Sequence, residues 1–310
     1  MDERPLRITA AICTHNRAAL LSAAIDSLLA QSLPPTDYEI LVIDNASTDA
    51  TPQIMQRYLG ASGRVTLRST VQPVLGLSHA RNLAVELAAG EIIAFMDDDA
   101  VATPGWLEAL LDAYTMHSDA WAVGGKVLPQ WEHQRPDWLT DDLLPQLSML
   151  DLGDAMRTLV AGEELYGANC SFRRRVFAEL GLFRTDLGRQ GAHLLGSEES
   201  ELQQRIRQRG KCLMYTPHAV VHHRVIAKRL QPRYFVQLAH GKGRTRARLM
   251  LADPSQRRNI AQHLTRGGLA VVRRWLMLGL YPFDKRRQLQ SMRITAHWFG
   301  FVQEVIGERR

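Results

Sequence analysis

Three consecutive aspartates, Asp97, Asp98 and Asp99, are the residues whose type and spacing best fit chemistry. Like charges this close repel one another, and the pKa values of the carboxyl groups rise unless a cation lies among them. A divalent ion that prefers oxygen ligands, Mg²⁺ or Mn²⁺ rather than zinc, would relieve the repulsion. Side chains alternate along a strand, so Asp97 and Asp99 are expected to share one side. The plain alternative is an acidic turn before the helix that begins at Pro104.

Glutamates, histidines and an arginine elsewhere could complete such a site. Glu198 and Glu199 open a predicted helix, and either carboxylate could deprotonate an acceptor hydroxyl, although acids in a first turn also simply favour the helix dipole. His222 and His223 follow an apolar stretch, and either imidazole could bind the metal or be structural. The guanidinium of Arg81 suits a diphosphate, but an arginine on a helix face is normally a solvated or packing residue.

The elements that position these residues alternate between strand and helix. Apolar runs predict strands at residues 8–13, 38–43, 65–69 and 91–96, and helical spacing predicts helices at residues 18–30, 51–59, 77–88 and 104–114. This alternation predicts an α/β fold with a doubly wound, mostly parallel sheet flanked by helices.

Polar loops follow three of the predicted strands: residues 14–17 after the first, 44–49 after the second and 97–99 after the fourth. Ligands of such sheets bind beyond the carboxyl ends of the strands. Three polar loops on one rim define a candidate site more firmly than any of them alone.

The second half of the chain has weaker patterns. Residues 130–164 are rich in Pro, Trp, Asp and Gly and predict a loop-rich excursion, followed by helices at 173–180 and 198–209 and a strand at 211–215. Basic amphipathic helices are predicted from residue 231 onward. We therefore expect a catalytic domain at 1–228 and a helical extension at 229–310.

The composition is that of a folded protein, with 45% hydrophobic and 23% charged residues. A formal charge of +6, concentrated after Arg224, suits an anionic partner or is only a solvated basic face. Cys13, Cys170 and Cys212 are too widely spaced for a zinc site or a disulfide framework. Without an apolar leader or an 18-residue apolar run, a cytoplasmic location is expected.

One C-terminal segment, residues 271–283, is apolar and aromatic with basic flanks. This pattern suits a helix lying on an anionic membrane surface, which would make the protein peripheral on the inner face of the membrane. The alternative is a helix that packs on the core or on a second subunit. The basic C-terminal region lacks the aromatic interleaving of RNA-binding proteins, so no nucleic-acid partner is expected.

Three motifs, at residues 42–51, 76–84 and 90–99, resemble in order and spacing the signatures of family 2 glycosyltransferases, which have the GT-A fold. The similarity is strong over residues 8–125, moderate over 166–224 and absent from the C-terminal helices. The resemblance implies that a nucleoside-diphosphate sugar is the donor and that Mg²⁺ or Mn²⁺ is required.

The resemblance also implies roles for individual residues. Glu199 aligns with the usual catalytic base, with Glu198 as its rival, and Gly167 and Asn169 would line the donor-sugar and acceptor side. Asp99, Asp97 and His223 would bind the metal, with His222 close behind. The residues implied in nucleotide binding are Thr14, His15, Asn16, Asp44, Asn45, Arg81, Asp97 and Asp98.

The function expected from these motifs is an inverting sugar transfer, with UDP favoured as the nucleotide, to a hydroxyl of a glycan or lipid-linked acceptor in the synthesis of a cell-surface polysaccharide or glycoconjugate. A sugar nucleotidyltransferase is one alternative, but residues 14–17 contain no glycine for a phosphate loop. The other alternative is an inactive binding scaffold, against which the intact aspartate triplet and glutamate pair argue.

Overall fold

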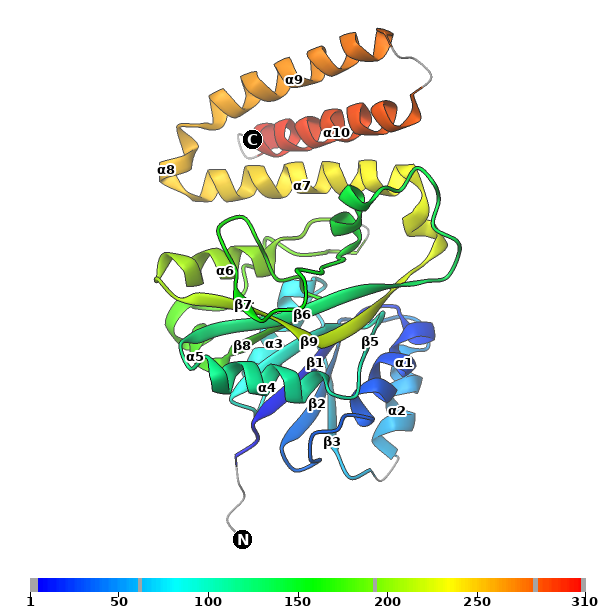
Figure 1. The fold of residues 1–310 in the computed structure, drawn as a ribbon, viewed down its shortest axis with the longest axis vertical. Helices are drawn as coiled ribbons and strands as arrows, with labels where there is room; N and C mark the ends of the chain where they lie inside the picture. The colour runs from blue at the N-terminus through cyan, green and yellow to red at the C-terminus, as the bar shows by residue number, and fades with distance from the viewer. Residues whose placement is uncertain (1–4, 61–62, 192–193, 281–283, 308–310) are drawn as a thin grey trace. The chain divides into compact units, whose positions relative to one another are not determined.

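A mixed sheet organises the computed structural model, which describes residues 5–60, 63–191, 194–280 and 284–307 (Figure 1). Within these ranges its strands are β1 (Ile8–Thr14), β2 (Tyr38–Asp44), β3 (Thr66–Val71), β4 (Ile92–Asp97), β5 (Ala100–Ala102), β6 (Ala120–Trp131), β7 (Arg157–Thr158), β8 (Asn169–Arg173) and β9 (Cys212–Val225). Their spatial order is β3-β2-β1-β4-β8-β6-β9-β5, and β7 pairs with β9.

The four predicted strands form the parallel part of the sheet. β1 pairs with β2 and β4, and β2 pairs with β3, all in parallel. β2 is buried at every position, as expected of a central strand covered on both faces. The predicted α/β fold class is confirmed.

The other part of the sheet is antiparallel, in the pairs β4–β8, β6–β8, β5–β9 and β7–β9. No α-helix lies between β6 and β8. Antiparallel neighbours need no helical crossover, so the alternation that revealed the first four strands stops here. The strand predicted at 211–215 is the start of the much longer β9.

Six helices described around this sheet are α1 (Ala18–Leu29), α2 (Thr51–Gly60), α3 (Leu77–Leu87), α4 (Trp106–Met116), α5 (Arg174–Leu180) and α6 (Glu198–Gln208). Helix α3 packs on β1 and β2. The buried side chains of α4 are Trp106, Leu107, Leu110, Leu111, Ala113 and Tyr114, which form one apolar face because they recur every three to four residues.

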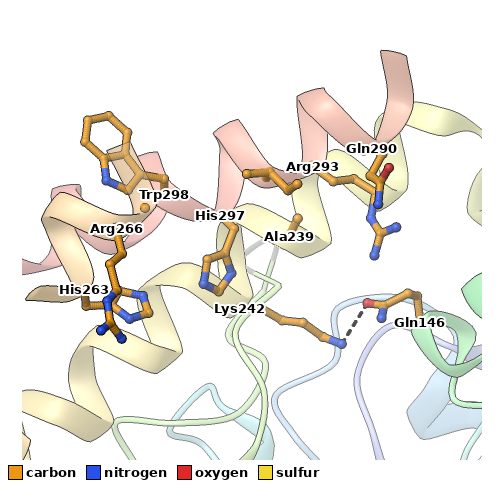
Figure 2. Close-up of a pocket in the computed structure, with 11 residues that line it drawn as sticks. Gln146, Ala239, Lys242, His263, Arg266, Gln290, Arg293, His297 and Trp298 are labelled. Carbon is orange, nitrogen blue, oxygen red and sulfur yellow. Dashed lines mark hydrogen bonds between the residues drawn. The ribbon is translucent and has the colours of Figure 1, made fainter. Parts of the chain in front are cut away.

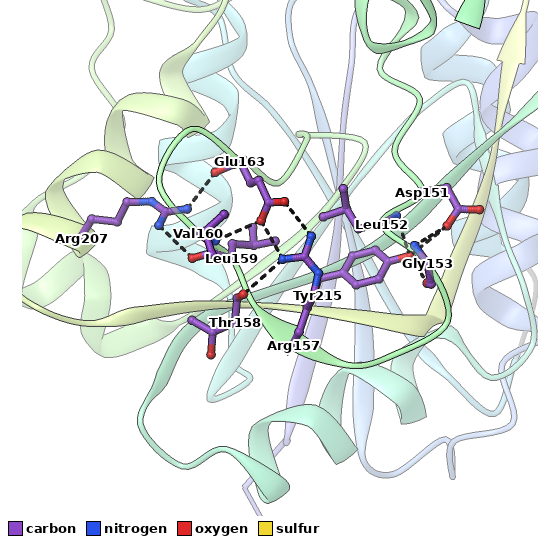
Figure 3. Close-up of polar contacts among 10 residues, drawn as sticks. All are labelled: Asp151, Leu152, Gly153, Arg157, Thr158, Leu159, Val160, Glu163, Arg207 and Tyr215. Carbon is purple, nitrogen blue, oxygen red and sulfur yellow. Dashed lines mark hydrogen bonds and ion pairs between the residues drawn. The ribbon is translucent and has the colours of Figure 1, made fainter. Parts of the chain in front are cut away.

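The loop-rich excursion is held against β9 and α6 by polar contacts (Figure 3). Arg157 forms a two-pronged ion pair with Glu163, at 2.7 and 2.8 Å. The Tyr215 hydroxyl donates to the Gly153 carbonyl at 3.1 Å. Arg207 donates to the carbonyls of Leu159 and Glu163. The segment is therefore ordered by side chains, although it contains little regular structure.

The chain divides into two compact units. The first, here called the catalytic unit, comprises 1–130, 148–186 and 198–224, and the second, the helical unit, comprises 131–147, 187–197 and 225–310. The helical unit contains the 3₁₀ helices η1 (Asp141–Leu147) and η2 (Ala227–Leu230) and the helices α7 (Pro232–Ala252), α8 (Pro254–Arg257), α9 (Ile260–Leu280) and α10 (Lys285–Gly307). The expected domain boundary at residue 228 stays a prediction.

Within the helical unit, α10 packs against both α7 and α9. Two glycines allow α7 and α10 to approach closely. A Cβ at Gly243 would lie 1.9 Å from the His297 carbonyl oxygen, and one at Gly300 would lie 2.1 Å from that of His240. Any larger residue at either position would force the two helices apart.

The segment predicted to lie on a membrane falls on α9 as far as Leu280, and residues 281–283 lie outside the described residues. Several apolar side chains of α9 are exposed: Leu269, Val272, Trp275, Leu276 and Met277. Among the described helices, none is both long enough and apolar enough to cross a bilayer.

Candidate active site

Strand register brings the three polar loops to one edge of the sheet. Thr14 at the end of β1 is paired with Asp44 at the end of β2, and Cys13 is paired with Asp97 at the end of β4. These pairs confirm the convergence that the sequence predicts. All the site residues described below belong to the catalytic unit.

Asp97, Asp99 and His223 form a cluster whose ligand atoms all lie within 4.8 Å of one another. His223 Nε2 is 3.0 Å from Asp99 Oδ1 and 3.8 Å from Asp97 Oδ2. Two carboxylates and one imidazole suit Mg²⁺ or Mn²⁺, because these ions prefer oxygen ligands and most of the ligands in this cluster are carboxylate oxygens. The cluster is therefore a candidate metal site.

The antiparallel pair β5–β9 delivers His223 to the aspartates. His223 is paired with Ala100, directly after the triplet, and the next residue, Arg224, donates its backbone N–H to the Asp99 carbonyl at 2.8 Å. His222 is paired with Val101 and lies outside the cluster, because consecutive strand residues point to opposite faces. The structure thus brings His223 rather than His222 to the aspartates, and the assignment of the metal ligands stays a prediction.

Arg81 connects this cluster to the glutamates of α6. Its Nη1 lies 2.5 Å from Glu198 Oε1 and 3.9 Å from Glu199 Oε2, and its Nη2 lies 3.8 Å from Asp97 Oδ1. Burial alone would lower the pKa of Arg81, but the charges of Glu198 and Glu199 outweigh it and hold the pKa above its ordinary value. Arg81 is therefore a permanent cation among carboxylates.

The guanidinium of Arg81 is also fixed by its apolar surroundings. Its central carbon lies 5.6 Å from the ring centre of Phe95 and 5.8 Å from that of Phe183, within cation–π range. The neighbouring Asn82 exchanges two hydrogen bonds of 2.9 Å with the backbone of Phe183. These contacts could not be predicted from the sequence, because Phe183 lies 101 residues after Asn82 in the chain.

Gly167 lies against Arg81 and Glu199. A Cβ at Gly167 would lie 2.3 Å from Arg81 Nη2. The backbone N–H of Gly167 donates to Glu199 Oε1 at 3.3 Å. Glu199 Oε2 is buried without a hydrogen-bond partner among the described residues. Glu198 is locked to Arg81, whereas Glu199 retains an oxygen that can accept a proton.

Asn169 lies inside the fold rather than along a substrate surface. It is fully buried, and its side chain accepts from Trp106 Nε1 at 2.8 Å and donates to the carbonyls of Lys126 and Ala219. The structure thus places the Asn169 amide in the core, and its lining role stays a prediction. Through these hydrogen bonds its amide links β8 to β6 and β9.

The loops after β1 and β2 are linked through the side chains of His15 and Asn16. His15 Nδ1 donates to the Asn45 carbonyl at 2.7 Å, and its Nε2 accepts from Asn16 Nδ2 at 3.2 Å. Asn16 Oδ1 accepts the backbone N–H of Thr48 at 2.7 Å. Asn16 has a φ of 53°, which asparagine tolerates better than most residues. Asn16 therefore orders the loop around the proposed nucleotide site.

Asn45 anchors the loop that leads into α3. Its Nδ2 donates to the Gln72 and Val74 carbonyls, at 3.1 and 2.8 Å, and its Oδ1 accepts from the Gly76 N–H at 2.8 Å. Asp44 Oδ1 accepts the backbone N–H of Ser47 at 3.0 Å. The side chain of Asn45 thus positions Arg81 indirectly, by fixing the start of its helix.

Asp98 is buried, unlike Asp97, whose side chain is 33% exposed. Burial and the adjacent charge of Asp99 raise the pKa of Asp98 to about 7. Arg17 offsets part of this rise, and its Nη1 lies 4.0 Å from Asp99 Oδ2. Sequence reasoning assigned no role to Arg17, although its place in the first polar loop was a signal.

The profile of glycosyl transferase family 2 matches residues 9–181, which include the three polar strand-end loops and all of β8 and α5. The chain belongs to this family. A family 2 chain of this kind is a glycosyltransferase that uses a sugar-nucleotide donor, and this membership decides against the nucleotidyltransferase alternative.

Two relatives and one solved structure show how far the likeness extends. A glucosyl-dolichyl phosphate glucuronosyltransferase of Haloferax volcanii is 29% identical over 73% of this chain and 72% of its own. The succinoglycan biosynthesis protein ExoM of Rhizobium meliloti is 25% identical over 99% and 95%. The mannosyltransferase PcManGT of Pyrobaculum calidifontis, solved with GDP-Man and Mn²⁺, covers 98% of this chain and 90% of its own at 18% identity and a TM-score of 0.64, which confirms the GT-A fold.

Proposed function

We propose that this glycosyltransferase moves a sugar from a nucleoside-diphosphate sugar to a hydroxyl of a glycan or lipid-linked acceptor, with inversion at the anomeric carbon. The observation that carries the proposal is the position of Arg81, within 4 Å of Asp97 on one side and of Glu198 and Glu199 on the other. One buried cation thus joins the candidate metal ligands to the candidate base.

The base in this mechanism is Glu199. Its Oε2 has no hydrogen-bond partner among the described residues, while its Oε1 is held by the Gly167 N–H at 3.3 Å. As the acceptor oxygen attacks the anomeric carbon, Glu199 takes the hydroxyl proton and the bond from that carbon to the diphosphate oxygen breaks. Because a single displacement turns the carbon over once, the product has the inverted configuration.

The departing diphosphate carries growing negative charge, which cations stabilise. Asp97, Asp99 and His223 would hold Mg²⁺ or Mn²⁺, and such an ion supplies positive charge to the leaving group. Arg81 adds a fixed positive charge beside Asp97, at 3.8 Å. Both ring nitrogens of His15 are bonded within the protein, so its contact with the nucleotide base, beside Thr14 and Asp44, would be stacking by the ring face.

We favour UDP as the donor nucleotide. TarS of S. aureus, which shares the fold at a TM-score of 0.56, was solved with UDP-GlcNAc, whereas PcManGT was solved with GDP-Man. The relative from Haloferax volcanii is named for a dolichyl-phosphate-linked acceptor and ExoM for succinoglycan biosynthesis. These names support a glycan or lipid-linked acceptor in polysaccharide or glycoconjugate synthesis.

A lipid-linked acceptor would require the enzyme to reach a membrane surface. The exposed apolar side chains of α9, with Arg273 and Arg274 beside them, suit contact with an anionic bilayer. Membrane contact by α9 is tested by sedimenting the purified protein with phosphatidylglycerol vesicles at low salt. The variant Leu269→Ser/Leu276→Ser should no longer sediment with the vesicles. Equal sedimentation of the variant would count against the α9 surface.

The central proposal is tested with a donor panel. UDP-, GDP- and dTDP-sugars are incubated with the enzyme and Mn²⁺, and donor hydrolysis or transfer to a simple glycoside is followed. One donor class should be consumed, and the anomeric configuration of the product is read by NMR. A product with the configuration of the donor would sink the single-displacement mechanism, and no turnover of any donor would contradict the assignment of the site.

A further inference from the structure

A cavity lies wholly within the helical unit (Figure 2). Its volume is about 480 Å³, within the range of small-molecule sites. It is lined by α7, α9, α10 and the end of η1, through Gln146, Ala239, Lys242, His263, Arg266, Gly267, Gln290, Arg293, Ile294, His297 and Trp298. None of the residues that line this cavity belongs to the candidate active site, which lies in the catalytic unit.

The lining is cationic. It includes Lys242, Arg266 and Arg293 and two imidazoles, and none of the lining residues is an aspartate or glutamate. Arg266 and Arg293 form no hydrogen bond or ion pair with another residue in the described ranges, unlike Arg244 and Arg248 of the same unit, which pair with an acid. The guanidinium donors of both lining arginines are therefore available to a ligand.

Burial also bears on the charge in this cavity. It lowers the pKa of Arg293, and Asp142 only partly offsets that effect. Burial and the charge of Arg246 likewise lower the pKa of His263, and burial with the neighbouring His263 lowers that of His297. Burial is the main reason that the charged forms of these three side chains are disfavoured, so an anion in the cavity would stabilise those charged forms.

The walls of the cavity are held by contacts of their own. Trp298 Nε1 donates to the Leu264 carbonyl at 3.0 Å, and its indole lies where a Cβ on Gly267 would be 2.4 Å away. The ring of His263 lies 4.3 Å from that of Phe301, which is fully buried. Lys242 Nζ donates to Gln146 Oε1 at 2.8 Å, the contact drawn as a dashed line in Figure 2. Packing and hydrogen bonds therefore hold in place the helices that carry the cationic side chains.

We propose that this cavity is a binding site for a phosphate or diphosphate group, separate from the nucleotide site. Two arginine forks suit the several oxygens of a phosphate, and a lysine adds a point charge. The apolar part of the lining, Ala239, Ile294 and Trp298, accommodates the carbon chain or ring to which the group is attached. The inference does not depend on the proposed reaction.

The test uses the full chain and two double variants. Arg266→Gln/Arg293→Gln removes the two arginines of the cavity, and Arg233→Gln/Arg258→Gln removes the same charge from exposed positions of the helical unit that lie outside the cavity and off α9. Sodium pyrophosphate is titrated calorimetrically at constant ionic strength, with EDTA to exclude metal-dependent binding in the nucleotide site. Sedimentation with phosphatidylglycerol and phosphatidylcholine vesicles runs in parallel, to distinguish a soluble phosphate from a lipid-borne one.

The cavity variant should lose affinity by at least about tenfold, because hydrogen bonds to charged groups are strong, while the control stays within about twofold of wild type. Saturable pyrophosphate binding with this pattern supports a site for soluble phosphates. Binding confined to anionic vesicles, lost in the cavity variant alone, supports a lipid-borne phosphate. Equal loss in both double variants, or no binding in either arm, overturns the proposal.

Discussion

Arg81 and Glu198 form a buried ion pair, with Nη1 and Oε1 2.5 Å apart and each side chain only 3% exposed. Burying two charges is costly, so we infer that this pair serves to position the guanidinium more than to stabilise the fold. Here the pair holds the guanidinium between α3 and α6, with Asp97 on one side and Glu199 on the other.

The first prediction concerns this pair. Arg81→Met removes the guanidinium counter-charge that lies 2.5 Å from the buried Glu198 carboxylate, so the free energy of unfolding should fall by about 3–5 kcal/mol. Arg81→Met/Glu198→Met removes both charges and should recover part of that loss, although neither variant should transfer sugar. Urea denaturation measures both. The exposed Arg64→Met serves as the control, and a double variant less stable than the single one would contradict the interpretation.

The second prediction separates the two glutamates. Glu199→Gln keeps the shape of the side chain but cannot take a proton, so kcat should fall by about 10²–10⁴-fold, with little change in melting temperature. Glu198→Gln weakens the buried pair, so its main effect should be on stability. Initial rates with saturating donor and thermal melts of both variants check this. If Glu198→Gln abolished turnover while Glu199→Gln retained it, the base would be Glu198.

Part of this site could be predicted from the sequence, because local patterns encode it. The apolar runs before residues 14, 44 and 97 fixed three neighbouring parallel strands, and parallel strands end on one edge. The choice between Glu198 and Glu199 was not local: it depends on which carboxylate meets an arginine more than a hundred residues earlier.

The partners of the antiparallel strands were equally hidden. His223 reaches the aspartates only through the register of β5 on β9, and a shift of one residue would have placed His222 there instead. The family resemblance implies that Asn169 lines the donor-sugar and acceptor side, but its amide bonds to a tryptophan and two carbonyls that only the fold brings together. Long-range pairing cannot be read from hydropathy or turn signals.

The third prediction uses the two histidines as a matched pair. His223→Ala removes a ligand of the Asp97–Asp99–His223 cluster, so the Mn²⁺ concentration for half-maximal activity should rise by about 10–100-fold, in line with the effect of perturbing metal sites. His222→Ala removes the same side chain from the opposite face of β9 and should leave that concentration near wild type. Equal effects of the two substitutions would argue against a metal site at this cluster.

The fourth prediction concerns Gly167. Its Cβ would lie 2.3 Å from Arg81 Nη2, so Gly167→Ala must displace the guanidinium or the turn that precedes β8. A displacement of about 1 Å at a catalytic group can cost about 10²-fold in rate, and kcat should fall accordingly while the fold survives. Gly105→Ala, where a Cβ meets nothing within 4 Å, is the control. Unchanged kcat in Gly167→Ala would show that the position of Arg81 does not limit turnover.

The last prediction concerns the helical unit, where Glu304 of α10 accepts from Arg244 at 2.7 Å and Arg248 at 2.6 Å, both on α7. Burial alone would raise the pKa of Glu304, but the two arginines lower it below 4.5. A carboxyl whose pKa is lower in the folded state stabilises it fully above the unfolded value, and the stabilisation is lost as the pH falls through the folded pKa. Glu304→Gln should therefore melt below wild type at pH 7, and the two melting temperatures should converge as the pH falls below 4.5. Thermal melts from neutral pH downward measure this, and a gap that stays constant throughout would mean that the ion pairs do not hold α10 to α7.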